Sequence, residues 1–258
     1  MCLLRFLQQK YPAKNRQQSV LIPDLTGFFS PFTGFRVNYP MIKLFRVPAL
    51  ALFWLMASVS VCRAQHNWKM RSEKDSIKIY TAQVPGSRIN AIKVATDFSA
   101  SLSQMVAVIL DINTSAEWVY STKSCTLLKQ VSPSELYYYS EIDFPWPASN
   151  RDFVANIKVS QDPHTKTVTV EASNLSDIVP VKSGVVRVTH FSGKWTLIPD
   201  GRNHIKVEYE LLVDPGGSIP SWLINLFATR GPFESFRKLR IQLQKPAYHK
   251  AVFPFIAD

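Results

Sequence analysis

The side chains that enzymes use for proton transfer and nucleophilic attack are present in this chain, but few stand at the spacing that catalysis requires. Glu141 and Asp143 share one face of an expected strand, an arrangement that a general acid and base would also have. Nothing in the neighbouring sequence positions the two carboxylates for proton transfer, so a solvated strand edge is the favoured interpretation. The histidines after residue 66 are scattered: His164, His190, His204 and His249. No G-x-S-x-G sequence is found that would hold a serine nucleophile.

Thiol, metal and phosphate chemistry are equally unsupported. Cys125 is the one cysteine after residue 64, so no internal disulfide is expected there, and a small buried thiol is the favoured interpretation. No His and Cys cluster has the spacing of metal ligands. Gly216-Gly217 is not followed by Lys-Ser/Thr, so it suits a turn better than a phosphate-binding loop. The sequence therefore predicts no enzyme, no metal and no cofactor.

Two groups of residues are better suited to binding. Arg151 and Asp152 are adjacent on an expected strand and point to opposite faces, so at most one of them can reach an interior cavity. The favoured role for this pair is to anchor the strand end by hydrogen bonds. Tyr137 and Tyr139 share one face of another strand. If that face is the inward one, the two residues contribute hydroxyls to a cavity; otherwise they belong to the packing of the sheet.

The strands that would position these residues follow from the alternation of apolar and polar side chains. Segments 76–84 and 89–98 alternate in this way around the turn signal Pro85-Gly86-Ser87, which predicts a hairpin. About six further strands are expected, over 125–131, 136–142, 151–159, 165–172, 184–199 and 204–213.

Helices are expected after the hairpin and again after the last strand. Ser101 or Ser103 can cap a helix that runs to Leu110, and a short helical turn is expected over 113–119. The long helix comes last, after all the strands. An order of mostly antiparallel strands with helices set apart from them predicts an α+β fold, in which a long curved sheet wraps around the last helix.

The segment Asp214-Pro-Gly-Gly-Ser-Ile-Pro-Ser-Trp-Leu-Ile-Asn225 joins the last strand to the start of this last helix. Ser218 can cap it, and Pro220 suits its first turn. Its apolar stripe is formed by Trp222, Leu223, Leu226 and Phe227, and resumes after Gly231-Pro232 with Phe233, Phe236, Leu239 and Leu243. A sheet that grips such a helix can leave a cavity for apolar ligands.

The chain before this domain has the pattern of a leader. Lys43 and Arg46 precede an apolar run over 47–61, and Cys62-Arg63-Ala64 offers small residues where a signal peptidase cuts. The run is shorter than the ~20 residues of a membrane-spanning helix. We expect a cleaved signal peptide over 41–64 and a secreted or periplasmic protein, with membrane anchoring by residues 47–62 as the alternative. Residues 1–40 are expected to be a disordered, non-native upstream extension.

Charge is concentrated in this leader. Of the formal net charge of +11, the first 64 residues hold eight Lys or Arg and one Asp, so about +4 belongs to residues 65–258. Such a mildly basic domain requires no nucleic-acid partner. The basic residues of the last helix either form a solvated face or attract anionic lipid head groups: Arg230, Arg237, Lys238, Arg240 and Lys245. We expect one monomeric domain over 65–258.

Several short motifs in this order resemble one family. They are Trp68 with Ile77-Lys78-Ile79-Tyr80, Leu110-Asp111 followed by Trp118, Phe144-Pro-Trp-Pro with Arg151-Asp152-Phe153, and the segment from Asp214 to Leu223. Each motif is weak by itself, but together they resemble the START domains, the lipid-transfer relatives of the steroidogenic acute regulatory protein. The resemblance extends from Trp68 to about Lys245.

The resemblance implies a helix-grip fold with a tunnel for one lipid or sterol-like molecule and a lid formed by the last helix and a neighbouring loop. It also implies that Leu223, Leu226 and Phe227 line this tunnel, with Trp222 at its mouth. The residues expected to bind the ligand are Tyr137, Tyr139, Arg151, Phe153, Ile157, Trp222, Leu223, Leu226 and Phe227. Several sterol carriers of the family have an arginine at the position of Ile157, so a sterol is not assured here. Transient contact with a membrane is also implied. The alternatives are an enzyme similar to the polyketide cyclases and aromatases, and a membrane-anchored lipid sensor.

Overall fold

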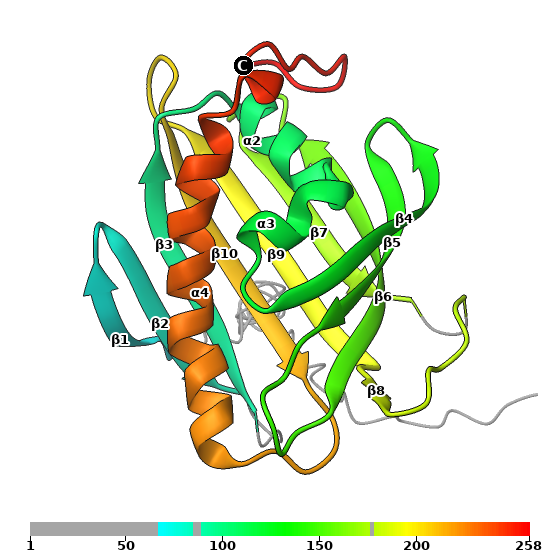
Figure 1. Cartoon of the computed structure of the whole chain (residues 1–258). Coiled ribbons are helices and arrows are strands. Elements are labelled where there is room, and N and C mark those ends of the chain that lie inside the picture. The colour runs from blue at the N-terminus through cyan, green and yellow to red at the C-terminus, as the bar shows by residue number, and fades with distance from the viewer. Residues whose placement is uncertain (1–66, 85–88, 176–177) are drawn as a thin grey trace, which may run out of the picture. The chain divides into compact units, whose positions relative to one another are not determined.

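The computed structural model describes residues 67–84, 89–175 and 178–258 (Figure 1). The expected extension over 1–40, the expected leader over 41–64 and the expected turn over 85–87 lie outside the described residues. Among the described residues, no helix is long and apolar enough to cross a membrane.

The strands form one curved sheet in the order β1-β2-β3-β10-β9-β7-β6-β5-β4 (Figure 1). Every neighbouring pair along this path is antiparallel, and the short β8 lies beside β6 in the parallel direction. The bounds are β1 Lys69–Lys74, β2 Ile77–Gln83, β3 Asn90–Phe98, β4 Thr122–Ser132, β5 Glu135–Ile142, β6 Asn150–Gln161, β7 Val168–Asn174, β8 Val185–Arg187, β9 His190–Pro199 and β10 Ile205–Asp214.

One row of paired residues shows how the sheet presents a single face to the interior. The row crosses from β5 to β2 and consists of Leu136, Ile157, Ala172, Gly193, Leu211, Ile92 and Thr81. Because successive side chains of a strand alternate between faces, the rest of this face follows at every second residue. The predicted alternation is thus confirmed, for example by the buried pairs Ile77 and Ile79, and Val168 and Val170.

The inward face is covered by α4, Ser221–Leu243, which lies along the sheet in front of β3, β10 and β9 (Figure 1). Its C-terminal half anchors it in the core through Phe236, Leu239 and Leu243, which are all nearly inaccessible to solvent. The smaller helices are α2 Leu102–Leu110, η1 Ile112–Thr114, α3 Ser115–Trp118 and η2 Pro246–Tyr248. Ser101 caps α2 by accepting a hydrogen bond from the Gln104 N–H at 3.1 Å. The α+β, helix-grip prediction is confirmed.

One strand was missed, and two local expectations were wrong. The six exposed residues of β1 show no burial alternation, so this edge strand was not predicted. Segment 184–199 is two strands, because the chain leaves the edge of β6 after Arg187 and joins β10 from His190 onward. The long helix is not capped by the side chain of Ser218: its N-cap is Pro220, and it runs without interruption through Gly231 and Pro232.

Candidate functional site

A cavity of about 570 Å³ lies between the inward face of the sheet and α4. Most of its wall is aromatic or aliphatic, with residues from β3, β6, β7, β9 and β10 below and from α4 above. A volume of this size and lining is typical of sites that bury a small apolar ligand. The arrangement supports binding of an apolar molecule.

Small residues in the middle of the sheet leave room for this cavity. Ala172 and Gly193 are paired neighbours on β7 and β9, and both line the cavity. A Cβ atom added to Gly193 would lie 3.5 Å from the Tyr209 hydroxyl and 3.6 Å from the Ala172 Cβ, which are ordinary contacts. A side chain at this position would therefore extend into the cavity without displacing the backbone.

The N-terminal half of α4 forms the roof through a line of residues one helical turn apart. Leu223, Phe227, Gly231 and Ser235 all line the cavity. Gly231 allows the helix to approach Tyr120 closely, since a Cβ here would lie 3.3 Å from the ring. The backbone N–H of Tyr120 also donates a hydrogen bond to the Ser235 hydroxyl, at 2.9 Å. The roof is thus held against the start of β4.

The chain reaches α4 through a glycine turn. Gly216 and Gly217 have φ angles of 65° and 64°, in the left-handed region that L-residues with side chains rarely adopt. Asp214 supports the turn by accepting a hydrogen bond from the Gly216 N–H at 3.0 Å. The prediction that these glycines form the turn into the helix is confirmed.

Two arginines are the charged side chains on the described wall of the cavity, and no carboxylate accompanies them there. Arg71 donates from Nε to the Thr81 hydroxyl at 2.7 Å. Arg151 is 3% exposed, and its guanidinium lies over the ring of Phe144 at 4.6 Å. Burial lowers the pKa of Arg151 from its ordinary value, because the charged form loses its hydration.

Two tyrosines and the thiol of the wall are held in their protonated forms. Burial raises the pKa of both Tyr138 and Tyr209 above the usual value for a phenol. Burial also raises the pKa of Cys125, which donates to the Ser140 hydroxyl at 3.3 Å. A raised pKa opposes the ionised form that a nucleophile requires, so these groups can hydrogen-bond to a ligand but are not activated at neutral pH.

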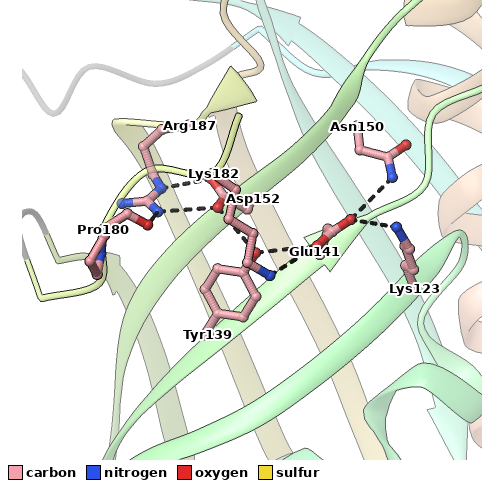
Figure 2. A network of polar contacts seen from close by, with 8 residues as sticks. All are labelled: Lys123, Tyr139, Glu141, Asn150, Asp152, Pro180, Lys182 and Arg187. Carbon is pink, nitrogen blue, oxygen red and sulfur yellow. Dashed lines mark hydrogen bonds and ion pairs between the residues drawn. The ribbon is translucent and has the colours of Figure 1, made fainter. Parts of the chain in front are cut away.

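A network of charged residues occupies the opposite face of β5 and β6 (Figure 2). Asp152 is fully buried and accepts two hydrogen bonds from Arg187, at 2.7 and 3.1 Å, and one from the Tyr139 hydroxyl at 3.1 Å. Arg187 also donates to the carbonyls of Val179 and Pro180, at 3.0 and 3.2 Å. The network therefore fastens the segment before β8 to the back of the sheet.

Glu141 belongs to the same network (Figure 2) and is buried, which contradicts the solvated strand edge expected from the sequence. It accepts hydrogen bonds from Lys123 at 2.8 Å, from Lys182 at 3.2 Å and from Asn150 at 3.2 Å. The bond from Lys123 is the main cause that lowers the pKa of Glu141 to about 2. The sequence could not reveal this, since Lys123 and Lys182 come from other segments.

Five of the nine residues expected to bind the ligand do lie on the cavity wall: Arg151, Phe153, Ile157, Leu223 and Phe227. The placement of Tyr137 and Tyr139 was wrong. On β5 it is Tyr138 that lines the cavity, while Tyr139 points to the Asp152 network on the other face. Of the pair Arg151 and Asp152, the arginine faces inward.

The placement of Leu226 on the cavity wall was also wrong, and Trp222, expected at the mouth, is not part of the described wall. Trp222 is 54% exposed. The inward side of α4 is centred on Phe227 and Gly231, and Leu226 is turned away from it by the helical repeat. The apolar stripe predicted from the sequence therefore included residues on the cavity side of the helix and residues on its outer surface.

Several wall residues were not predicted as site residues: Arg71, Trp118, Tyr120, Tyr138, Gly193 and Tyr209. Trp118 was recognised as a motif residue, but nothing local showed that it faces the cavity. The alternation of β10 could have revealed Tyr209, whose partner across the sheet is Trp195. In the described parts of the chain, no cluster of His, Cys, Asp or Glu could hold a metal ion.

Comparison with known proteins gives one family. Residues 57–248 match the family model described as the START domain. An uncharacterized protein of Pseudomonas aeruginosa is 33% identical over 181 residues, which cover 69% of this chain and 88% of the relative. The phosphatidylcholine transfer protein of Rattus norvegicus is 30% identical over 189 residues, covering 71% of this chain and 86% of the relative.

Solved structures agree with this result. A STAR-related lipid transfer protein from Xanthomonas axonopodis is 32% identical to this chain and superposes with a TM-score of 0.64. The superposition covers 69% of this chain and 99% of the solved chain. The human StAR-related lipid transfer protein 5 has a TM-score of 0.62 at 14% identity and covers 76% of this chain and 93% of its own. The second likeness shows a shared fold.

Proposed function

This chain belongs to the START domain family, and from that premise we propose that it binds a lipid in its internal cavity and transfers it without chemical change. The observation that carries the proposal is the apolar cavity of about 570 Å³ roofed by the first half of α4. The lipid's apolar chain would lie along the row of Ile157, Ala172, Gly193 and Leu211, beneath Phe227.

The gain from such burial is sufficient for useful affinity. Removing apolar surface from water contributes roughly 25 cal/mol per Å², so an acyl chain that buries about 300 Å² gains roughly 7 kcal/mol. Part of this gain is offset by the ordering of the lipid and of the lid. The balance is compatible with a carrier that holds its cargo in water and releases it at a membrane.

Transfer requires the lid to open, and we propose that the mouth contacts a membrane when it does. Trp146, in the loop between β5 and β6, is 89% exposed, and Trp222 and Ile224 at the start of α4 are 54% and 45% exposed. The two segments are joined by contact between Phe144 and Phe227. Tryptophan favours the membrane interface because its ring is apolar while its N–H stays hydrated.

Liposome co-sedimentation tests this contact. Trp146→Ala and Trp222→Ala together should reduce binding to vesicles that the wild-type chain binds. Val252→Ala is the matched control, since Val252 is 81% exposed but follows the other end of α4. Equal loss with Val252→Ala would show that the mouth has no special role.

The cargo is a phospholipid in the simplest version of this proposal, since a relative of this chain at 30% identity is named a phosphatidylcholine transfer protein. Catalysis is not proposed. The wall groups that could act as nucleophile or base, Tyr138, Tyr209 and Cys125, have pKa values raised by burial and no activating partner on the described wall. An enzyme of the cyclase kind would need one of them ionised or paired with a base.

Export through the leader is a further part of the proposal. The basic residues Lys43 and Arg46, the apolar run and Cys62-Arg63-Ala64 favour cleavage close to Gln65. N-terminal sequencing of protein recovered from the cell envelope or medium tests it. Chains that retain Met1 or Met41 would support the anchored alternative instead.

The direct test of function is native mass spectrometry of the full-length chain after gentle purification, followed by extraction and identification of what it carries. We expect one unmodified lipid per chain. Recovery of a chemically converted product that disappears when Tyr138, Tyr209 or Cys125 is substituted would replace the carrier with an enzyme. Absence of any bound or bindable amphiphile would reject the proposal.

A further inference from the structure

We propose that the cargo carries an acidic head group, a phosphate or a carboxylate, and that Arg151 binds it at the mouth of the cavity. The inference rests on the proposed lipid-binding function and specifies the chemistry of the ligand. It follows from three features of the wall: its charge, the partners of Arg151 and an unpartnered buried hydroxyl in the same row of the sheet.

The charge of the described wall has one sign. Its charged side chains are Arg71 and Arg151, and no Asp or Glu lines the cavity with them. Charge removed from water is costly unless an opposite charge compensates it. Arg71 is exposed and keeps its hydration, whereas Arg151 is 3% exposed. An apolar cavity with one buried cation and no carboxylate is therefore complementary to a ligand that is apolar over most of its length and anionic at one end.

Arg151 is buried without an opposite charge beside it. It donates to the carbonyls of Pro215 at 3.5 Å and Gly216 at 3.3 Å, and also to the carbonyl of Ser149. These acceptors are neutral, and no salt bridge joins Arg151 to a carboxylate in the described part of the chain. A guanidinium has five N–H groups, so the three hydrogen bonds leave two donors for a ligand.

The other buried guanidinium near this strand differs in that respect. Arg187 is paired with Asp152 on the opposite face of β6, at 2.7 Å. The sheet thus neutralises the arginine behind it and leaves the adjacent inward one, Arg151, without a counter-ion. A purely structural arginine would be expected to have a carboxylate partner as Arg187 does.

An unpartnered polar atom lies in the same row of the sheet as Arg151. Thr122 on β4 pairs with Ile142 on β5, and Ile142 pairs with Arg151 on β6, so the three form one row. The Thr122 hydroxyl is buried without a hydrogen-bond partner, and Thr122 lines the cavity. The indole N–H of Trp118 is also buried without a partner, but its ring packs against Trp195, farther along the cavity.

This row has the dimensions of a head-group site. Thr122 and Arg151 are two strands apart, roughly 10 Å between backbones. An oxyanion above Ile142 would accept hydrogen bonds from the guanidinium and from the Thr122 hydroxyl, satisfying buried donors that now lack partners. A zwitterionic head group would also bring a cation, for which the described wall holds no carboxylate.

The experiment measures displacement of a fluorescent apolar probe from the full-length chain by lipids matched in acyl chain. Dioleoyl phosphatidate and oleate are the acidic ligands; dioleoyl phosphatidylcholine and oleyl alcohol are their counterparts without net charge. We expect each acidic ligand to bind at least about tenfold more tightly than its counterpart, and Arg151→Gln to abolish most of the difference while leaving oleyl alcohol binding unchanged.

Two variants separate the contribution of Arg151 from other effects. Arg71→Gln is the matched control, because Arg71 is exposed and already bonded to Thr81, so the preference should persist. Arg151→Lys keeps the positive charge and should retain part of the preference. If Arg151→Gln does not fold, as judged by circular dichroism, the comparison of ligands on the wild-type chain still decides the inference.

The outcomes are distinguishable. Equal affinity for phosphatidate and phosphatidylcholine in the wild-type chain would overturn the acidic head group while leaving lipid binding intact. Loss of the preference in Arg71→Gln but not in Arg151→Gln would overturn the assignment to Arg151. Inorganic phosphate that competes as strongly as phosphatidate would show a free-anion site rather than a lipid head-group site. Failure of every amphiphile to bind would reject the proposed function itself.

Discussion

The ring of Phe227 lies nearly flat against the ring of Phe144, with centroids 4.2 Å apart and planes 5° apart. Phe227 also meets Tyr120 edge to face, with centroids 5.5 Å apart. Phe227 belongs to α4, Phe144 to the loop after β5 and Tyr120 to the connection into β4. A single side chain thus joins the roof of the cavity to two segments of its rim.

Shortening this side chain should speed the exchange of cargo. In Phe227→Ala both aromatic contacts are lost, so we expect faster lipid release into acceptor vesicles and a free energy of unfolding lower by about 1–3 kcal/mol. A vesicle-to-vesicle transfer assay with a fluorescent lipid measures the rate. Leu226→Ala is the control, since Leu226 is the next residue on α4 and lies off the wall. Similar acceleration by Leu226→Ala would contradict a specific role for the ring contacts.

Filling the floor of the cavity should block binding without unfolding the protein. Gly193 has no positive φ, and an added Cβ would meet its neighbours at 3.5 Å or more, so Gly193→Leu projects into the cavity without backbone strain. We expect lipid affinity to fall at least about tenfold, equivalent to about 1.4 kcal/mol. Ser192→Leu, on the opposite face of β9, should leave affinity unchanged. Undiminished binding by Gly193→Leu would place the ligand elsewhere.

The buried pair of Asp152 and Arg187 should matter more to stability than any surface pair. In Arg187→Met the Asp152 carboxylate stays buried without its main counter-charge, and we expect a loss of about 3–5 kcal/mol in the free energy of unfolding. Lys78→Met removes the exposed pair with Glu73, 3.7 Å apart, and should cost at most about 1 kcal/mol. Chemical denaturation of the variants measures both. Equal effects would show that Asp152 finds other compensation.

Glu141 should make stability depend on pH in the acidic range. Its folded-state pKa is lowered from 4.5 to about 2, so the unfolded chain takes up the proton first as pH falls. The contribution is therefore complete above the unfolded value and is lost as the pH decreases through 4.5 toward 2. It amounts to at most about 3 kcal/mol, less after solvent screening, because Lys123 and Lys182 are half exposed.

The matched variant for this pH dependence is Glu141→Gln, which keeps the shape of the side chain and removes the titrating carboxyl. We expect its unfolding free energy to be lower than that of the wild-type chain at pH 6 and to converge with it near pH 2. Denaturant unfolding at several pH values within this window gives the two curves. Parallel curves would mean that other carboxyl groups cause the acid sensitivity.

The strands and the terminal helix could be predicted from the sequence because their pattern is local. Alternation such as Ile77 and Ile79, or Val168 and Val170, reports burial on one face whatever lies opposite. The turn at Gly216 and Gly217 was equally predictable, since few other residues adopt its backbone angles. Neither β1 nor the break before β9 was predicted, because neither produces a local burial pattern in the sequence.

The orientation of the binding residues was decided by the tertiary structure. Three successive tyrosines leave both faces of β5 aromatic, and only the pairing of Tyr138 with Ala155 on β6 turns its hydroxyl toward the cavity. The sequence by itself determined that Arg151 and Asp152 face opposite ways, because adjacent residues of a strand must. Which of them faces inward depended on partners 35 and 64 residues away, Arg187 behind the sheet and Pro215 between β10 and α4, and no local pattern encodes contacts so distant in sequence.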